Sequence, residues 1–129
     1  MRQVAVTEGN KVSAQINFGW QVNTWPVGDL VEYVNAVTEE EISTQLAEYK
    51  ERYDINTINL ESIRYQAKLN KDMKKCLDKI GAKAFTDTFE DLHGLEQLGG
   101  LASQNLMYDG YGFGGEGDWK TSAMTHIVK

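Results

Sequence analysis

"LESIRYQAKLNKDMKKCLDKIGAKAFTDTF", residues 60–89, places a long helical pattern directly before a short apolar run. Apolar residues recur along its first part at the spacing of one helix face: Ile63, Ala67, Met73, Leu77 and Ile80. Gly81 follows where a helix C-cap is expected. The run "AKAFTDTF" (82–89) then predicts a buried strand. We interpret the Lys and Asp residues of "LNKDMKKCLDK" (69–79) as a solvated helix face.

Upstream of this stretch the patterns predict two more helices and a hairpin. Thr38 and Glu41 have capping-box spacing and begin a helix through "TEEEISTQLAEYKERYDI" (38–55), and Asp29 caps a shorter one before it. At the N-terminus Val4 and Val6 alternate with polar residues, "TEGNK" makes a turn, and a second alternation follows at Val12, Ala14 and Ile16. That pattern predicts a β-hairpin.

Downstream, "EDLHGLEQLGG" (90–100) is typical of a loop beyond a strand, and "GLASQNLMYDG" (100–110) predicts a short helix. Asp118 is placed to cap a last helix, "WKTSAMTHIVK" (119–129). Strands and helices therefore interleave after a hairpin, and the fold class is α/β or α+β.

Composition narrows the class of protein. The chain has 129 residues, enough for one domain, with 41% hydrophobic and 25% charged residues. Its net charge of −6 argues against a nucleic-acid partner. No apolar run is long enough for a membrane span, and the N-terminus has no signal-like apolar region. The single cysteine, Cys76, favours a reducing, cytoplasmic setting.

The stretch "GYGFGGEGDWKTS" (110–122) crowds glycines around one carboxylate, Glu116. It contains G-x-G-x-x-G twice, but the preceding segment looks helical and no acidic residue follows at the required distance, which disfavours a dinucleotide site. Glu116 is a candidate metal ligand or acid–base group; the alternative is an exposed glutamate on a plain surface loop. Beyond the predicted strand, "TFEDLH" (88–93) offers Glu90, Asp91 and His93, or simply ordinary loop residues. Two histidines and one cysteine assemble no zinc pattern.

Two long stretches resemble L-arabinose isomerase: "AFTDTFEDLHGLEQLGGLASQNLM" and "DGYGFGGEGDWKTSAM". The segment that precedes them in that family is similar to two further stretches, "MRQVAVTEGNKVSAQINFGW" and "VGDLVEYVNAV". The resemblance weakens only in "THIVK". It implies an α/β fold. It also implies that residues 1–129 are a single segment, which corresponds to the central domain of an L-arabinose/L-fucose isomerase-like protein. The family's N-terminal and C-terminal domains are expected to be absent.

The resemblance also implies an activity, the interconversion of L-arabinose and L-ribulose with Mn²⁺, and more slowly of D-galactose and D-tagatose. It implies that Glu116 is one of two glutamates that bind the metal and exchange a proton, and that Phe89 lines the sugar pocket. The family assembles as homo-oligomers. Its second metal glutamate and both metal histidines lie downstream of the last matched word, so the isolated chain is expected to be inactive.

The chain departs from the family at four positions. Members commonly carry threonine at Asp87, proline at Gly99, and alanine and leucine at Ser122 and Met124. An alternative function is a non-catalytic module that associates with isomerase subunits. Five aromatic residues would then supply a contact surface, or else belong to the core: Phe18, Trp20, Trp25, Phe113 and Trp119.

Overall fold

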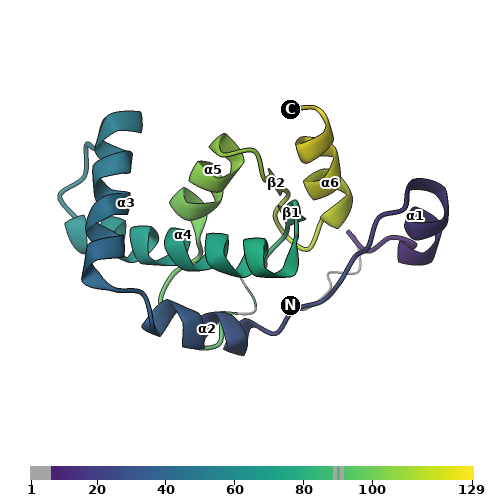
Figure 1. Ribbon diagram of the computed structural model, residues 1–129, viewed down its shortest axis with the longest axis horizontal. Helices are drawn as coiled ribbons and strands as arrows, with labels where there is room; N and C mark the ends of the chain where they lie inside the picture. The colour runs from purple at the N-terminus through teal and green to yellow at the C-terminus, as the bar shows by residue number, and fades with distance from the viewer. Residues whose placement is uncertain (1–6, 89, 91) are drawn as a thin grey trace.

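A computed structural model describes residues 7–88, 90 and 92–129 of the chain (Figure 1). The elements, in chain order, are α1 (Lys11–Phe18), α2 (Val27–Asn35), α3 (Glu39–Arg52), α4 (Leu60–Ile80), β1 (Ala84–Phe85), α5 (Gly100–Tyr108), β2 (Gly112–Phe113) and α6 (Trp119–Ile127). In Figure 1, α4 runs through the centre, α3 crosses one of its ends, and the two strands with α6 lie beyond the other. None of the helices in the described ranges combines the length and the apolar character that a membrane crossing needs.

The predicted N-caps of α3 and α6 and the predicted C-cap of α4 are confirmed. Thr38 accepts a bond from the Glu41 amide, and the Glu41 carboxylate accepts one from the Thr38 amide at 3.0 Å, which completes the capping box. Gly81 ends α4 in the left-handed conformation, with φ of 69°. The Asp118 side chain accepts a bond from the Thr121 amide at 3.0 Å. Helix α2 begins at Val27, earlier than predicted, with Asp29 in its first turn.

Among the described residues, two apolar clusters form the core, and α4 contributes to both. The first joins α4 to α2 and α5 and consists of Val34, Leu69, Met73, Leu77, Ala102 and Leu106. The second joins α4 to α3 and consists of Val37, Ile42, Tyr49 and Ala67. Removing these side chains from water provides the main stabilisation of the helical region.

A polar layer accompanies the apolar contacts between α4 and α5. The Asn105 amide donates to Asn70 at 2.7 Å, and the Gln66 amide donates to the Leu98 carbonyl at 2.8 Å. These polar side chains are buried, so their mutual bonds offset the cost of desolvation.

Strands β1 and β2 pair in parallel, with Ala84 opposite Gly112 and Phe85 opposite Phe113. The fold is mostly helical with this small parallel sheet, which is compatible with an α/β central domain. The strand predicted over 82–89 is therefore reduced to two residues.

The predicted hairpin is wrong. Its second strand is helix α1, and the strands formed by the described residues, β1 and β2, are parallel, whereas a hairpin is antiparallel. Val4 and Val6 lie outside the described residues. The Asn10 side chain accepts a bond from the Ser13 amide at 2.8 Å, and Gly19 ends the helix with φ of 71°. These two caps outweigh a short apolar alternation, whose members Val12 and Ile16 also have helical i, i+4 spacing.

The interpretation of residues 69–79 as a solvated face holds for the exposed Lys75 and Asp78 but is wrong for Asp72. Asp72 is fully buried, and neither of its carboxylate oxygens has a hydrogen-bond partner among the described residues. Burial raises the pKa of Asp72 to about 7, although the positive charges of Lys75 and Lys68 lower it in part.

Candidate functional site

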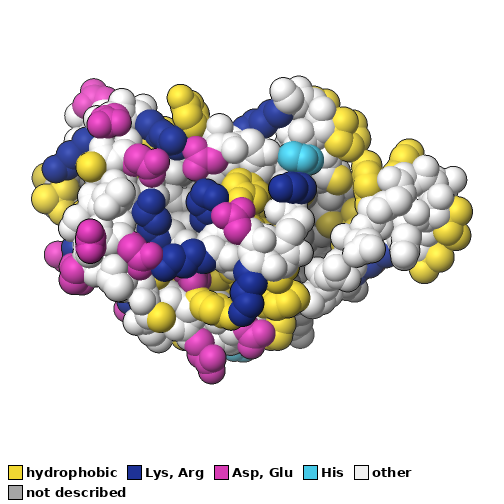
Figure 2. Space-filling model, in the orientation of Figure 1, with side chains coloured by type: hydrophobic (Ala, Val, Ile, Leu, Met, Phe, Trp, Pro, Cys, Tyr) yellow, Lys and Arg dark blue, Asp and Glu magenta, His cyan; other side chains and the backbone are white. Residues whose placement is uncertain are grey.

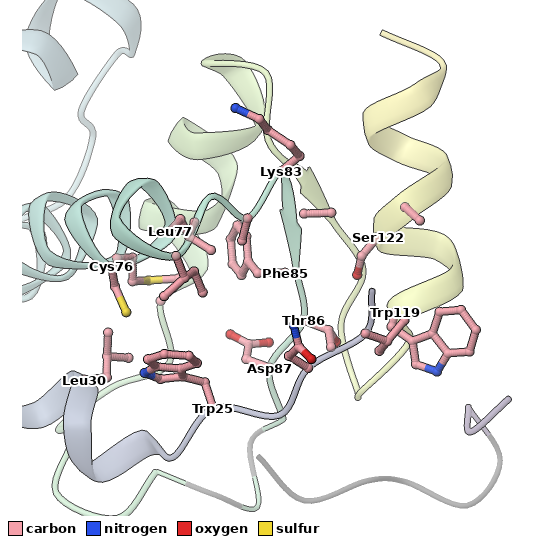
Figure 3. A pocket seen from close by; sticks show the side chains of 18 of the residues that line it. Trp25, Leu30, Cys76, Leu77, Lys83, Phe85, Thr86, Asp87, Trp119 and Ser122 are labelled. Atoms are coloured by element: carbon pink, nitrogen blue, oxygen red, sulfur yellow. The ribbon is translucent and has the colours of Figure 1, made fainter. Parts of the chain in front are cut away.

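A cleft of about 850 Å³ lies between the extended segment 19–27, the C-terminal part of α4, β1 and α6. Figure 3 shows Trp25, Leu30, Leu77 and Phe85 around it, with the Asp87 side chain among them. An apolar cleft with a few polar groups is the usual form of a small-molecule site.

Asp87 lies two residues beyond the end of β1, where parallel strands commonly present functional groups. Burial raises the pKa of Asp87, and the nearby carboxylate of Glu116 raises it further. The Asp87 carbonyl also accepts a bond from the Gly117 amide at 3.0 Å. The strand end and the glycine stretch therefore meet at the cleft.

Glu116, the candidate catalytic and metal-binding residue, lies on an exposed turn between β2 and α6. It does not line the cleft itself, but it lies beside Asp87, which does. Its φ of 60° is in the left-handed region that side chains other than glycine rarely adopt. Strained backbone of this kind is enriched at functional sites, and the conformation is compatible with the predicted role of Glu116. The role of Glu116 remains a prediction.

The glycines before Glu116 bring β2 close to α6. A Cβ atom on Gly112 would stand 2.0 Å from the Ser122 carbonyl oxygen, and one on Gly114 would stand 2.7 Å from the Asp118 carbonyl oxygen. Side chains at these positions would therefore push α6 away. The group that approaches this backbone is helix α6. A dinucleotide-binding G-x-G-x-x-G pattern follows a strand, whereas β2 lies inside the pattern here.

The remaining sequence candidates fall partly outside the residues that the structure describes. Phe89, the predicted sugar-pocket residue, and Asp91 lie outside the described residues. Glu90 and His93 are exposed in the loop after β1. His126 lines the cleft from α6, with its Nδ1 atom 2.9 Å from the Gly110 carbonyl oxygen.

Across the described ranges, no three or more His, Cys, Asp or Glu side chains come together to hold a metal ion.

Sequence reasoning missed two residues of this region. Asp87 entered only as a departure from the family, although its place just beyond a predicted strand was a usable signal. The sequence pattern places Thr7 in a turn, yet its hydroxyl donates to the Glu116 carbonyl at 2.7 Å. No sequence pattern links two residues that are 109 positions apart.

Comparison with known proteins gives a consistent result along the whole chain. A family model described as "L-arabinose isomerase central domain" matches residues 1–129. The chain is 53% identical over 135 aligned positions to an L-arabinose isomerase of Geobacillus kaustophilus, covering 100% of this chain and 27% of the relative. It is 53% identical to one of Oceanobacillus iheyensis, again over all of this chain and 28% of the relative. It is 51% identical to an L-arabinose isomerase of Salmonella enteritidis, and that alignment covers 100% of this chain and 27% of the relative.

The chain thus spans about a quarter of the length of these curated relatives, 27% in the first case. Because both the family match and the alignments extend over every residue, the chain belongs to the L-arabinose isomerase family, whose central domain it matches.

Proposed function

We propose that this chain is the central part of an aldose–ketose isomerase that interconverts L-arabinose and L-ribulose in the cytoplasm and acts as a homo-oligomer. The observation that carries the proposal is the match of the L-arabinose isomerase central domain to all 129 residues. The cleft at the end of β1 is compatible with it, since small-molecule sites are usually concave and combine apolar lining with a few polar groups.

The reaction moves one proton from C2 to C1 of the open-chain sugar and another from O2 to O1. A carboxylate removes the C2 proton, the electron pair of that C–H bond forms the C1–C2 double bond, and the π pair of the C1–O1 carbonyl moves onto O1. The proton of O2 passes to O1, the C2–O2 double bond forms, and the carboxylic acid returns its proton to C1 as the C1–C2 double bond is lost. We assign this transfer to Glu116, because the resemblance to L-arabinose isomerase implies that role. Its exposed side chain, on a turn hydrogen-bonded to the strand end, is compatible with the assignment. Phe89 is proposed to line the sugar pocket.

A divalent ion such as Mn²⁺, when bound, would stabilise negative charge on the two sugar oxygens. Glu116 suits it as an oxygen ligand, and Asp87 adds a second carboxylate nearby. The described residues still do not complete a site, since no cluster of three ligating side chains occurs among them. We therefore propose that polypeptide beyond these 129 residues supplies the other ligands, and that the chain alone does not isomerise sugar.

A chimera tests the assignment. Residues 1–129 replace the matching segment of the Geobacillus kaustophilus L-arabinose isomerase, to which they are 53% identical. We expect the chimera to convert L-arabinose to L-ribulose with Mn²⁺ present. Glu116→Gln in the chimera should lower kcat by about 100-fold or more, because the amide cannot accept the proton.

The matched control is Glu96→Gln, which makes the same change on an exposed residue of the loop before α5. Circular dichroism and gel filtration of all the chimeras establish that they fold. A folded chimera with Glu116→Gln that keeps the parent kcat would exclude Glu116 as the proton carrier.

The isolated chain provides the complementary measurement. Purified residues 1–129 should release no ketose from L-arabinose with Mn²⁺ at concentrations where the chimera is fully active. L-ribulose formed by the isolated chain would contradict the proposal that further ligands are required.

A second candidate function is association with isomerase subunits without catalysis. The observation that favours it is the apolar surface of α1, where Val12, Ile16 and Phe18 are each more than 60% exposed. In Figure 2 charged side chains gather over α3 and α4, while the lobe that carries α1 shows mainly hydrophobic and uncharged ones. Gel filtration of the chain with a full-length L-arabinose isomerase distinguishes the two: this function requires co-elution, and independent elution of a monomer rejects it.

A further inference from the structure

The turn that carries Glu116 needs a restraint. Glu116 has a φ of 60° and precedes Gly117, which has a φ of 74°. A residue with a Cβ atom is disfavoured in this conformation, and it persists only where the surrounding structure holds it. The restraint must act on the backbone, because the Glu116 side chain is exposed.

The peptide group that joins Glu116 to Gly117 is hydrogen-bonded on both sides. Its carbonyl oxygen accepts a bond from the Thr7 hydroxyl at 2.7 Å. Its N–H donates to the Asp87 carbonyl at 3.0 Å. One partner comes from the N-terminal segment and the other from the end of β1, so this peptide plane cannot rotate without losing both bonds. Its orientation sets ψ of Glu116.

Two further contacts hold the N-terminal segment over the start of α6. The Lys120 ammonium donates to the Glu8 carbonyl at 3.3 Å. Gly9 approaches the Trp119 ring so closely that a Cβ atom would stand 2.8 Å from a ring carbon. Residues 7–9 therefore form a strap that is fixed to residues 116–120 at three points. The strap places the Thr7 hydroxyl against the Glu116 carbonyl.

We propose that Thr7 is a positioning residue: its hydroxyl, together with the Asp87 carbonyl, holds the 116–117 peptide in the orientation that directs Glu116. The catalytic meaning of this restraint rests on the proposed function of Glu116. The restraint itself is a property of the 129-residue chain and is measurable without metal or sugar.

Amide hydrogen exchange of Gly117, followed by NMR on the whole chain, tests the restraint. Thr7→Val keeps the shape of the side chain and removes the donor, whereas Thr7→Ser keeps the donor. Loss of one hydrogen bond corresponds to about five- to tenfold easier local opening, so the Gly117 amide of Thr7→Val should exchange about five- to tenfold faster. Thr7→Ser should exchange at the wild-type rate.

Thr44→Val is the matched control, since the Thr44 hydroxyl also donates to a backbone carbonyl, that of Glu40, at 2.9 Å on exposed α3. It should leave Gly117 exchange unchanged. The amides of α4 serve as an internal reference for global stability in every variant. Wild-type exchange of Gly117 in Thr7→Val, or equal acceleration in Thr44→Val, would overturn the proposal.

Titration with Mn²⁺ separates this proposal from the proposed function. Paramagnetic broadening of the amides of residues 115–117 should occur in the wild-type chain and weaken in Glu116→Gln. Equal broadening in both chains would remove Glu116 from metal binding, while the exchange result for Thr7 would stand on its own.

Discussion

Between α4 and α5, large side chains fill the interface, whereas α6 lies against β2 with almost nothing but backbone between them. Leu69, Met73 and Leu106 are buried in the first interface. In the second, Gly112 and Gly114 contact the α6 backbone, and Ser122 is the one residue of α6 that is fully buried. Neither apolar core cluster of the described chain draws a member from α6.

The difference between these two interfaces indicates that one region of the molecule provides most of the stability and another sets the geometry of the candidate site. The helical region of α2 to α5 is held by side-chain burial, which is strong but not directional. The β1–β2–α6 region is held by close backbone approach and by specific bonds, such as the one from the Phe113 amide to the Thr125 hydroxyl at 2.9 Å. A small change in the second region should therefore shift the position of Glu116 without unfolding the first.

The largest effect is expected in the helical core. Leu106 is fully buried, so Leu106→Ala leaves a cavity and should lower the free energy of unfolding by about 2–5 kcal/mol. Urea denaturation followed by circular dichroism measures this loss. The exposed Leu60 provides the control, and Leu60→Ala should change stability by less than about 0.5 kcal/mol. Equal losses in the two variants would contradict the division into regions.

Gly112→Ala should release α6 while the helical core stays folded. The added Cβ would stand 2.0 Å from a backbone oxygen that cannot move independently, and we expect about 3 kcal/mol of local destabilisation. Hydrogen exchange should accelerate over residues 112–127 and remain slow in α4.

Gly115→Ala is the control for this second change, because a Cβ at Gly115 meets nothing within 4 Å. It should leave α6 exchange at the wild-type rate. Global unfolding by Gly112→Ala, with α4 and α6 exchanging together, would show that the two regions are one cooperative unit.

Asp72 is a buried carboxyl group that destabilises the otherwise well-packed helical region, and its effect on the free energy of unfolding depends on pH. Its pKa is raised to about 7 in the folded chain, while the unfolded value is near the ordinary one of about 3.8. The folded state therefore retains its proton over this window, and stability falls as pH rises from about 4 to about 7, then stays low. Asp72→Asn should remove this dependence and raise stability at pH 8 by about 1–3 kcal/mol.

Asp78→Asn is the matched control for Asp72. Lys74 and Tyr111 lower the pKa of the exposed Asp78, which pairs with Lys74 at 2.6 Å, so the same substitution should leave stability at pH 8 unchanged or slightly lower. Denaturation midpoints between pH 4 and pH 8 measure both variants. A flat profile for the wild-type chain between pH 4 and 7 would refute the raised pKa of Asp72 in the folded state.

The smallest effect concerns the strained turn. Glycine tolerates a φ of 60°, so Glu116→Gly should be more stable than Glu116→Ala by about 1 kcal/mol. At most positions the order is reversed, because alanine restricts the unfolded chain more than glycine does. Thermal denaturation compares the stability of the two variants. A more stable alanine variant would indicate that the turn relaxes to an ordinary conformation.

Local chemistry explains which elements could be predicted. The capping box of Thr38 and Glu41, the C-cap at Gly81 and the Asp118 cap each depend on residues within one turn of each other, and all three appear in the structure. The hairpin failed because alternation at Val12, Ala14 and Ile16 also fits a short helix, and the caps at Asn10 and Gly19 favour the helix.

The sequence alone determined the caps of α3, α4 and α6, the family, and Glu116 as the candidate group, because each of these depends on neighbouring residues or on long matched stretches. Only the tertiary structure decided that Asp72 is buried, that the glycines contact α6, and that Thr7 and Asp87 hold the Glu116 turn from opposite sides. The bonds of Thr7 and Asp87 to the Glu116 turn join residues far apart in the chain, and packing creates them without leaving a periodic pattern in the sequence.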